Sequence, residues 1–146
     1  MKRIISILLL TTLILVLSAC GMGNPKIEDY EWKMRVVMSN DIALADSDEV
    51  VIAVGRPDEI YPHAKIVELT LLAKKGKLTI TDATNSKIHE GTYKAFKKTP
   101  DGTDYEITID GKNGYATIAM TKYYDGTKEP TLPITLDEYS IYFYAN

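Results

Sequence analysis

From residue 30 onward, apolar and polar residues alternate with a period of two, and Gly, Pro, Asn and Asp interrupt the alternation at short intervals. Alternation of this kind is typical of half-buried β-strands, whereas amphipathic helices repeat about every 3.6 residues. The first expected strand places four apolar side chains on one face, namely Trp32, Met34, Val36 and Met38. The chain therefore predicts an all-β fold built from short strands.

Turn signals divide this region into eight or nine expected strands. The strongest signal is Asp110-Gly111-Lys112-Asn113-Gly114, because Gly and Asn tolerate the positive φ angles of tight hairpins. Residues 64–73 alternate clearly, with Val67, Leu69, Leu71 and Ala73 expected to face inward. Consecutive strands joined by short turns form an antiparallel up-and-down meander, which removes its exposed edges by closing into a barrel. A two-sheet sandwich is the alternative.

Residues 1–20 differ from everything that follows them. They read MKRIISILLLTTLILVLSAC, with Lys2 and Arg3 ahead of an apolar, uncharged run over residues 4–17. At about 1.5 Å per residue, a helix of this length falls short of a hydrocarbon core of about 30 Å. A basic start, a short apolar run and small residues at its end indicate a secretory signal peptide.

The signal ends in Leu17-Ser18-Ala19-Cys20, which resembles the lipobox of bacterial lipoproteins. The resemblance implies that residues 1–19 are removed and that the Cys20 thiol carries a diacylglyceryl group. Two acyl chains hold a protein on a bilayer much more firmly than one, so we expect the protein on the extracytoplasmic face of the cell membrane. The alternative is that Cys20 is the free thiol of an ordinary secretory peptide. Residues 20–29 are expected to form a short tether, and residues 30–146 the barrel domain.

Removal of residues 1–19 also changes the charge of the chain. The full sequence has a net charge of −3, and the loss of Lys2 and Arg3 leaves −5. An acidic domain lacks the basic face that binds phosphates, so we expect no nucleic acid as a partner. Cys20 is the single cysteine of the sequence, so the domain has to be stabilised by its apolar core and not by an internal disulfide.

Short motifs within the expected strands resemble a known group of folds. A tryptophan in Asp29-Tyr30-Glu31-Trp32 and a central Gly91-Thr92-Tyr93 resemble the calycins, the lipocalin-like group of small barrels. Residues 76–82, 90–94 and 129–132 are similar to small lipoproteins of Gram-positive bacteria. The resemblance implies a calycin-like barrel on the outer face of a Gram-positive plasma membrane, with a small apolar or amphipathic ligand inside it.

Aromatic residues supply the candidate binding site. The sequence has ten tyrosines and two phenylalanines, so most of its aromatic rings carry a polar group. Tyr142 and Tyr144 share one face of the last expected strand. If that face points inward, it lines a semi-polar cavity with Trp32, Met34 and Tyr115. If it points outward, it offers an aromatic patch to a glycan or a partner protein, and ordinary cross-strand pairing is a further alternative.

Motifs for catalysis and metal binding are weak. His63 and His89 do not have the spacing of zinc ligands, and no serine stands in a Gly-x-Ser-x-Gly elbow. The acidic stretch from Asp41 to Glu49 lacks the residue order of a calcium loop. We therefore expect no enzyme activity, no metal and no cofactor. The sequence favours a membrane-anchored binding protein for a small apolar or amphipathic ligand, and the alternative is a cell-envelope module that binds a protein or glycan through exposed tyrosines.

Overall fold

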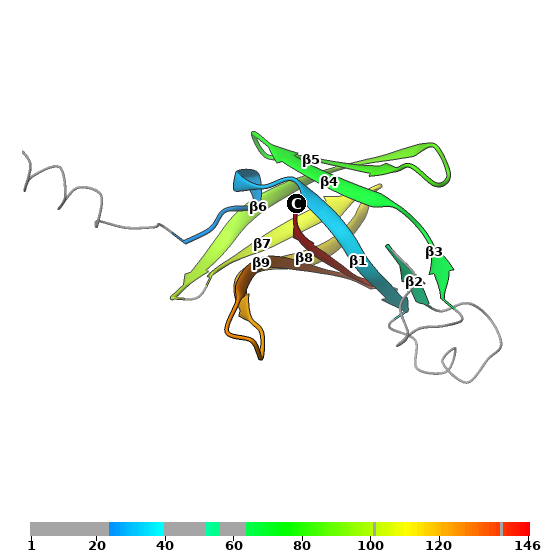
Figure 1. Ribbon diagram of the computed structural model, residues 1–146. Coiled ribbons are helices and arrows are strands. Elements are labelled where there is room, and N and C mark those ends of the chain that lie inside the picture. The colour runs from blue at the N-terminus through cyan, green and yellow to red at the C-terminus, as the bar shows by residue number, and fades with distance from the viewer. Residues whose placement is uncertain (1–23, 40–51, 56–63, 101, 138) are drawn as a thin grey trace, which may run out of the picture.

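The computed structural model describes residues 24–39, 52–55, 64–100, 102–137 and 139–146 (Figure 1). A single-turn 3-10 helix, η1 (Ile27–Asp29), precedes the first strand. The strands are β1 (Trp32–Ser39), β2 (Ile52–Val54), β3 (Lys65–Ile66), β4 (Leu69–Lys74), β5 (Lys77–Asp82), β6 (Lys87–Thr99), β7 (Gly102–Ile109), β8 (Lys112–Lys122), β9 (Lys128–Leu136) and β10 (Tyr139–Ala145). The expected signal peptide and Cys20 lie outside the described residues.

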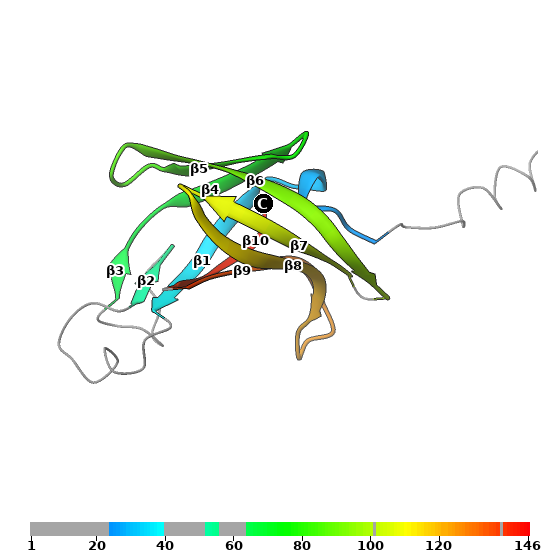
Figure 2. The ribbon, with the colours of Figure 1, turned by 180° about the vertical axis from the view of Figure 1, so that it is seen from behind.

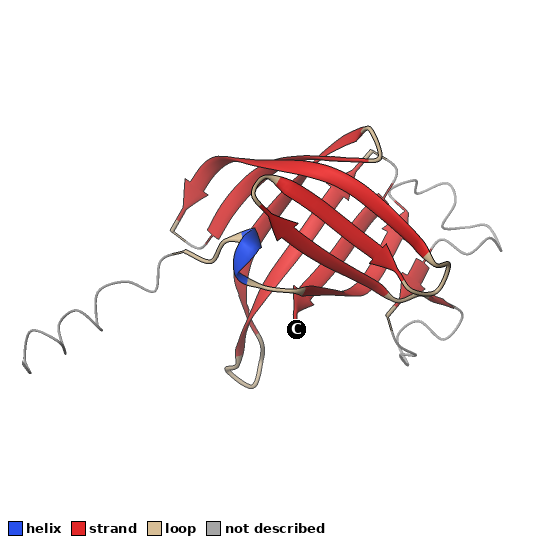
Figure 3. Cartoon of the chain, turned by 90° about the horizontal axis from the view of Figure 1, so that it is seen from above, coloured by secondary structure: helices blue, strands red, loops and turns tan. Residues whose placement is uncertain are grey.

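Eight of these strands form a closed antiparallel barrel, which Figure 3 shows from above. Neighbours follow the order β10, β9, β8, β7, β6, β5, β4 and β1, and β1 then returns to β10. The closing ladder runs from the pair of Trp32 with Ala145 to the pair of Ser39 with Tyr139. The prediction of an all-β, antiparallel up-and-down barrel is thus confirmed, and the sandwich alternative is wrong.

The two remaining strands, β2 and β3, extend the sheet beside the far part of β1. β1 pairs with β4 through Trp32 and Lys33, and then with β2 from the pair of Val36 with Val54 onward. β3 runs parallel to β2. One edge of β1 is therefore shared between the barrel and this small extension.

A β-bulge in β1 changes which side chains face the core. Met34 pairs with Phe143 and Val36 pairs with Tyr142, so Arg35 is an extra residue on the β1 side. An extra residue reverses the alternation that follows it. Trp32 and Met34 are accordingly buried, but beyond the bulge it is Val37 that packs against the core. The prediction that Val36 and Met38 share the face of Trp32 is wrong for this reason.

Two of the hairpins turn through pairs of residues with positive φ. Lys75 and Gly76 have φ angles of 51° and 79°, and Asp110 and Gly111 have φ angles of 50° and 81°. Two consecutive positive φ angles define the type I′ turn, whose twist matches that of the adjoining strands. The predicted hairpin turn after β7 is confirmed, and the turn after β4 has the same geometry.

One contiguous cluster of buried side chains occupies the inside of the barrel. Trp32 and Phe143 are its largest fully buried members, and the inward face predicted over residues 64–73 belongs to it, with Leu69 partly buried. The cluster consists of Ile27, Trp32, Met34, Val67, Leu71, Ala73, Leu78, Ile80, Tyr105, Ile107, Ile109, Ala116, Ile118, Leu132, Ile134, Leu136 and Phe143.

The helix η1 covers one end of the barrel. The side chain of Ile27 is completely buried, the indole N–H of Trp32 donates a hydrogen bond to the Ile27 carbonyl at 2.9 Å, and the Ile27 N–H donates to the Tyr105 hydroxyl at 3.2 Å. The turn itself is held by the Lys26 N–H, which donates to the Asp29 carboxylate at 2.8 Å. The packed domain therefore begins before residue 30, and the part of the chain left to act as a tether is shorter than the sequence indicated.

We predict that Ile27→Ala lowers the free energy of unfolding by about 2–5 kcal/mol, because the substitution leaves a cavity under η1. The matched control is Ile88→Ala, since Ile88 is 62% exposed and its truncation is expected to change stability by less than about 0.5 kcal/mol. Urea unfolding followed by tryptophan fluorescence measures both variants. Equal effects of the two substitutions would contradict the role of η1 as a packed cap.

Candidate functional site

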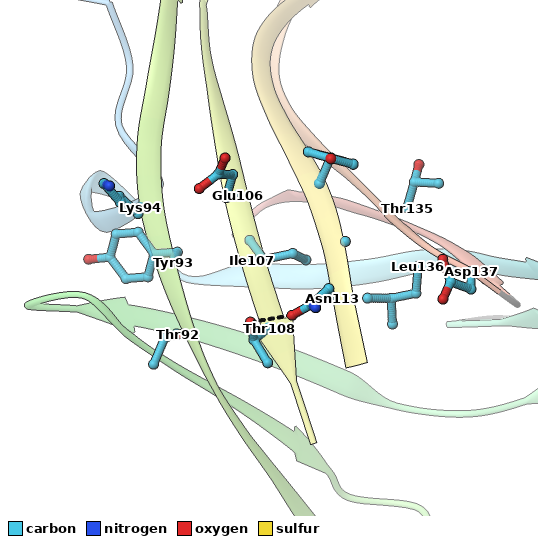
Figure 4. Close-up of a pocket in the computed structure, with 12 residues that line it drawn as sticks. Thr92, Tyr93, Lys94, Glu106, Ile107, Thr108, Asn113, Thr135, Leu136 and Asp137 are labelled. Atoms are coloured by element: carbon cyan, nitrogen blue, oxygen red, sulfur yellow. Dashed lines mark hydrogen bonds between the residues drawn. The ribbon is translucent and has the colours of Figure 1, made fainter. Parts of the chain in front are cut away.

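A groove with a volume of about 880 Å³ lies over strands β6 to β9 (Figure 4). Nine of its residues belong to β6, to β7 or to the start of β8. The other three are the last two residues of β9 and the residue that follows them. The groove is lined by Thr92, Tyr93, Lys94, Glu106, Ile107, Thr108, Asn113, Gly114, Tyr115, Thr135, Leu136 and Asp137.

Strand register places most of these side chains on the outer wall of the barrel. Lys94 pairs with Glu106, Glu106 with Tyr115, and Tyr115 with Thr135, so four neighbouring strands contribute one outward row. All four residues of this row are exposed. The residues between them, such as Ile107, belong to the core cluster. The groove is therefore a hollow in the outer wall and not the interior of the barrel.

A glycine makes this part of the wall possible. A side chain at Gly114 would place its Cβ 2.3 Å from the Thr135 carbonyl oxygen and 2.7 Å from Leu136 Cδ2. Real Cβ atoms do not approach backbone so closely, and only glycine allows such contact between adjacent strands. Gly114 thus lets β8 lie against β9 beneath the groove.

The polar lining of the groove offers both donors and acceptors. Lys94 supplies an ammonium group and Glu106 supplies a carboxylate on the adjacent strand. A second outward row pairs Thr92 with Thr108 and Thr108 with Asn113, and the Thr108 hydroxyl donates to the Asn113 side-chain oxygen at 3.0 Å. The groove can therefore hydrogen-bond a ligand that carries several hydroxyl or amide groups.

An aromatic pair stands beside this polar lining. The rings of Phe96 and Tyr115 meet edge to face, with their centroids 6.1 Å apart, although the two residues are 51% and 62% exposed. A bulge in β6 produces the contact, because Ala95 pairs with Tyr105 and Lys97 with Asp104, which leaves Phe96 as the extra residue. Bulges often redirect a side chain at a functional site. Here the bulge turns an apolar ring outward beside Tyr115.

Tyr93 connects the groove to the barrel cap. Its hydroxyl donates a hydrogen bond to the Glu28 carboxylate of η1, and its ring meets that of Tyr105 edge to face at 5.9 Å. Burial, and then the bond to Glu28, raise the pKa of the Tyr93 hydroxyl to about 12. The same bond, with the Lys75 backbone N–H, holds the pKa of the Glu28 carboxyl below its usual value. The hydrogen bond between Tyr93 and Glu28 thus joins the wall of the groove to η1.

The five binding residues predicted from the sequence lie in three places. Trp32 and Met34 are in the core, with 0% and 3% exposure. Tyr115 lines the groove. Tyr142 and Tyr144 face outward on β10, because the alternate residue Phe143 is buried. The structure does not bring these residues together into one site.

Tyr144 belongs to a separate cluster around Arg35. The Arg35 guanidinium lies 5.1 Å from the Tyr144 ring centroid and donates a hydrogen bond to the Tyr123 hydroxyl at 3.0 Å. It also lies 3.7 Å from the Glu129 carboxylate, which accepts a bond from the Tyr123 hydroxyl at 2.7 Å. Since Arg35 is the bulge residue of β1, this cluster could not be read from the sequence alternation.

Sequence reasoning missed the polar half of the groove. Lys94, Glu106 and Asn113 are ordinary surface residues when each is viewed in its own strand. The available signal was the hairpin turn at Asp110-Gly111, which fixes the β7–β8 register and thereby places Glu106 opposite Tyr115. The β6–β7 ladder contains a bulge, and no comparable turn signal in the sequence indicated its register.

Metal ligands do not gather in the described part of the chain, where no group of three or more His, Cys, Asp or Glu side chains is placed to hold an ion. His89 Nδ1 lies 2.5 Å from an Asp110 carboxylate oxygen, and this bond lowers the pKa of the Asp110 carboxyl. His63 and the acidic stretch from Asp41 to Glu49 lie outside the described residues.

Comparison of the chain with protein-family models, curated proteins and solved structures found no match. Among the described residues, no helix is long and apolar enough to span a membrane.

We predict that the free energy of unfolding falls as the pH rises from about 10 to 12. In this range the unfolded chain releases the Tyr93 proton first, since the usual tyrosine pKa is about 10 whereas the folded value is about 12. The contribution of Tyr93 is fully present below pH 10 and is lost as the pH passes through the folded pKa.

Tyr93→Phe removes the titrating group and is expected to make this alkaline decline shallower. Urea unfolding at several pH values between about 9 and 11 measures the slope. An unchanged slope in Tyr93→Phe would contradict the burial and the Glu28 bond assigned to Tyr93.

Proposed function

We propose that the protein is a membrane-anchored, extracytoplasmic lipoprotein that binds a hydroxyl-rich ligand, such as a cell-envelope glycan chain, in the groove over β6 to β9. Binding is non-covalent and needs no catalytic step. The observation that carries the proposal is the combination of an outward row of donors and acceptors with an exposed pair of aromatic rings.

Glycans match this combination chemically. A sugar presents hydroxyl groups at its rim and apolar C–H groups on its faces, so it needs hydrogen-bonding side chains and an aromatic surface together. Tyr115 and Phe96 supply the aromatic surface, and Lys94, Glu106 and Asn113 supply donors and acceptors. The volume of about 880 Å³ falls within the range of about 300–1,000 Å³ found for ligand sites.

The location of the groove favours an outer ligand over one held inside the barrel. A small apolar ligand in the interior would have to share that space with the core cluster, in which Trp32 is completely buried. A ligand in the outer groove would not have to displace any side chain of the core cluster. The resemblance of residues 17–20 to a lipobox supports membrane anchoring, and in an anchored chain the groove would be near the glycans of the cell envelope.

We predict that Tyr115→Ala weakens glycan binding about tenfold or more, because an aromatic contact of this size contributes about 1.4 kcal/mol or more to binding. Tyr115→Phe keeps the ring and is expected to bind within about threefold of the natural chain. Co-sedimentation of the full chain with purified peptidoglycan, and calorimetric titration with soluble glycan fragments, measure the effect.

The matched control is Tyr142→Ala, since Tyr142 is also an exposed tyrosine but does not line the groove. It is expected to bind as the natural chain does. Loss of binding in Tyr142→Ala and not in Tyr115→Ala would assign the binding face to β10. Unchanged binding in both variants would overturn the proposed site.

A further inference from the structure

The two ends of the barrel carry different charges. In an antiparallel meander the turns alternate between the ends, so the turns after β4, β6 and β8 lie at one end and those after β5, β7 and β9 at the other. Figures 1 and 2 show η1 and the start of the described chain at the first of these ends. We call it the lysine end.

Seven exposed lysines flank the three turns of the lysine end, two or three at each turn. They are Lys74, Lys75, Lys77, Lys97, Lys98, Lys122 and Lys128. Among the described residues of these turns, Asp125 is the acidic one. At the opposite end, the charged residues that the structure describes in the turns and beside them are three carboxylates and two lysines, namely Asp82, Asp110, Asp137, Lys87 and Lys112. The barrel is therefore polarised along its axis.

Other carboxylates near the lysine end form hydrogen bonds or an ion pair with residues of the same domain. Glu28 accepts hydrogen bonds from Tyr93 and from the Lys75 N–H, and Glu129 lies against Arg35. Asp104 accepts a bond from the Thr117 hydroxyl at 2.9 Å. Asp29 of η1, which accepts a hydrogen bond from the Lys26 N–H, and Glu31 are two further exposed carboxylates. The seven lysines stand in these turns or at the strand ends beside them.

The chain leaves the barrel at this same end. The Asn24 side-chain amide donates hydrogen bonds to the carbonyls of Thr99 at 2.5 Å and Gly102 at 3.3 Å, which pins residue 24 to the turn after β6. Three residues separate Asn24 from Cys20. Fully extended, the four steps between them span at most about 14 Å.

We infer that the lysine end rests on the anionic phospholipid headgroups of the membrane in which Cys20 is anchored. The inference relies on the lipid anchor of the proposed function. The short tether holds Lys97 and Lys98 near the surface, and the attraction of lysines to anionic lipid acts within a Debye length of about 8 Å. Tyr124, which is exposed and belongs to the turn after β8, supplies a ring suited to the interface. The end with the turns after β5, β7 and β9 then points away from the membrane, and the groove opens along the membrane surface.

The test uses the full lipidated chain in vesicles of phosphatidylcholine with about 30% phosphatidylglycerol and a headgroup nitroxide lipid. Cys20 is the single natural cysteine and is consumed by lipidation, so one added cysteine can carry a fluorophore. Thr127→Cys reports the lysine end and Ser86→Cys the opposite end. We expect nitroxide quenching at residue 127 to exceed that at residue 86 at least about twofold, and to fall in about 0.5 M salt.

Two double variants, one at each end of the barrel, remove the same number of lysine charges and form a matched pair. Lys97→Gln with Lys98→Gln is expected to reduce quenching at residue 127 by about half, whereas Lys87→Gln with Lys112→Gln at the opposite end leaves it unchanged. Vesicle flotation measures anchoring in parallel. A chain that floats with the vesicles but is quenched equally at both ends would overturn the inference and leave the anchor intact. A chain that does not float would overturn the anchor, and the inference with it, while glycan binding is still measured separately.

Discussion

The contact between Trp32 and Ile27 organises the structure around it. The indole donates to the Ile27 carbonyl inside the barrel, where both side chains are completely buried, so η1 has to lie across the barrel end. That position brings Glu28 to Tyr93 on the wall and Asn24 to the turn after β6. The end at which the chain exits, and hence the end nearest an N-terminal anchor, is fixed by this buried contact.

Local signals in the sequence were sufficient for most of the fold. The alternation over residues 64–73 predicts a strand, and the Gly and Asn residues within 110–114 predict a hairpin, because each signal depends on residues close in sequence. The bulges at Arg35 and Phe96 could not be predicted, since an extra residue depends on the partner strand. The candidate site shows the same difference between local and long-range information. Tyr115 was predicted as a binding residue from the sequence. Its polar neighbours were not, because only the register of four strands brings them together.

The outer groove and the polarised barrel lead to one arrangement. A packed interior supplies rigidity, and the wall over β6 to β9 carries the hydrogen-bonding groups and the aromatic pair. The proposed anchor beside the lysine end would turn this wall sideways, so that the groove faces along the membrane. A glycan lying along the surface would then meet the groove from the side, without passing through the barrel. In this proposed arrangement the barrel acts as a scaffold, and the register of its strands determines which side chains line the groove.

The most direct test of the central claim, that the ligand binds on the outer wall, is amide NMR of the full chain in detergent micelles during titration with a soluble peptidoglycan fragment. We expect the shifted signals to fall within residues 92–94, 106–108, 113–115 and 135–137, with the Trp32 indole signal unchanged. Shifts concentrated at Trp32, Met34 and Phe143 would place the ligand inside the barrel and contradict the account.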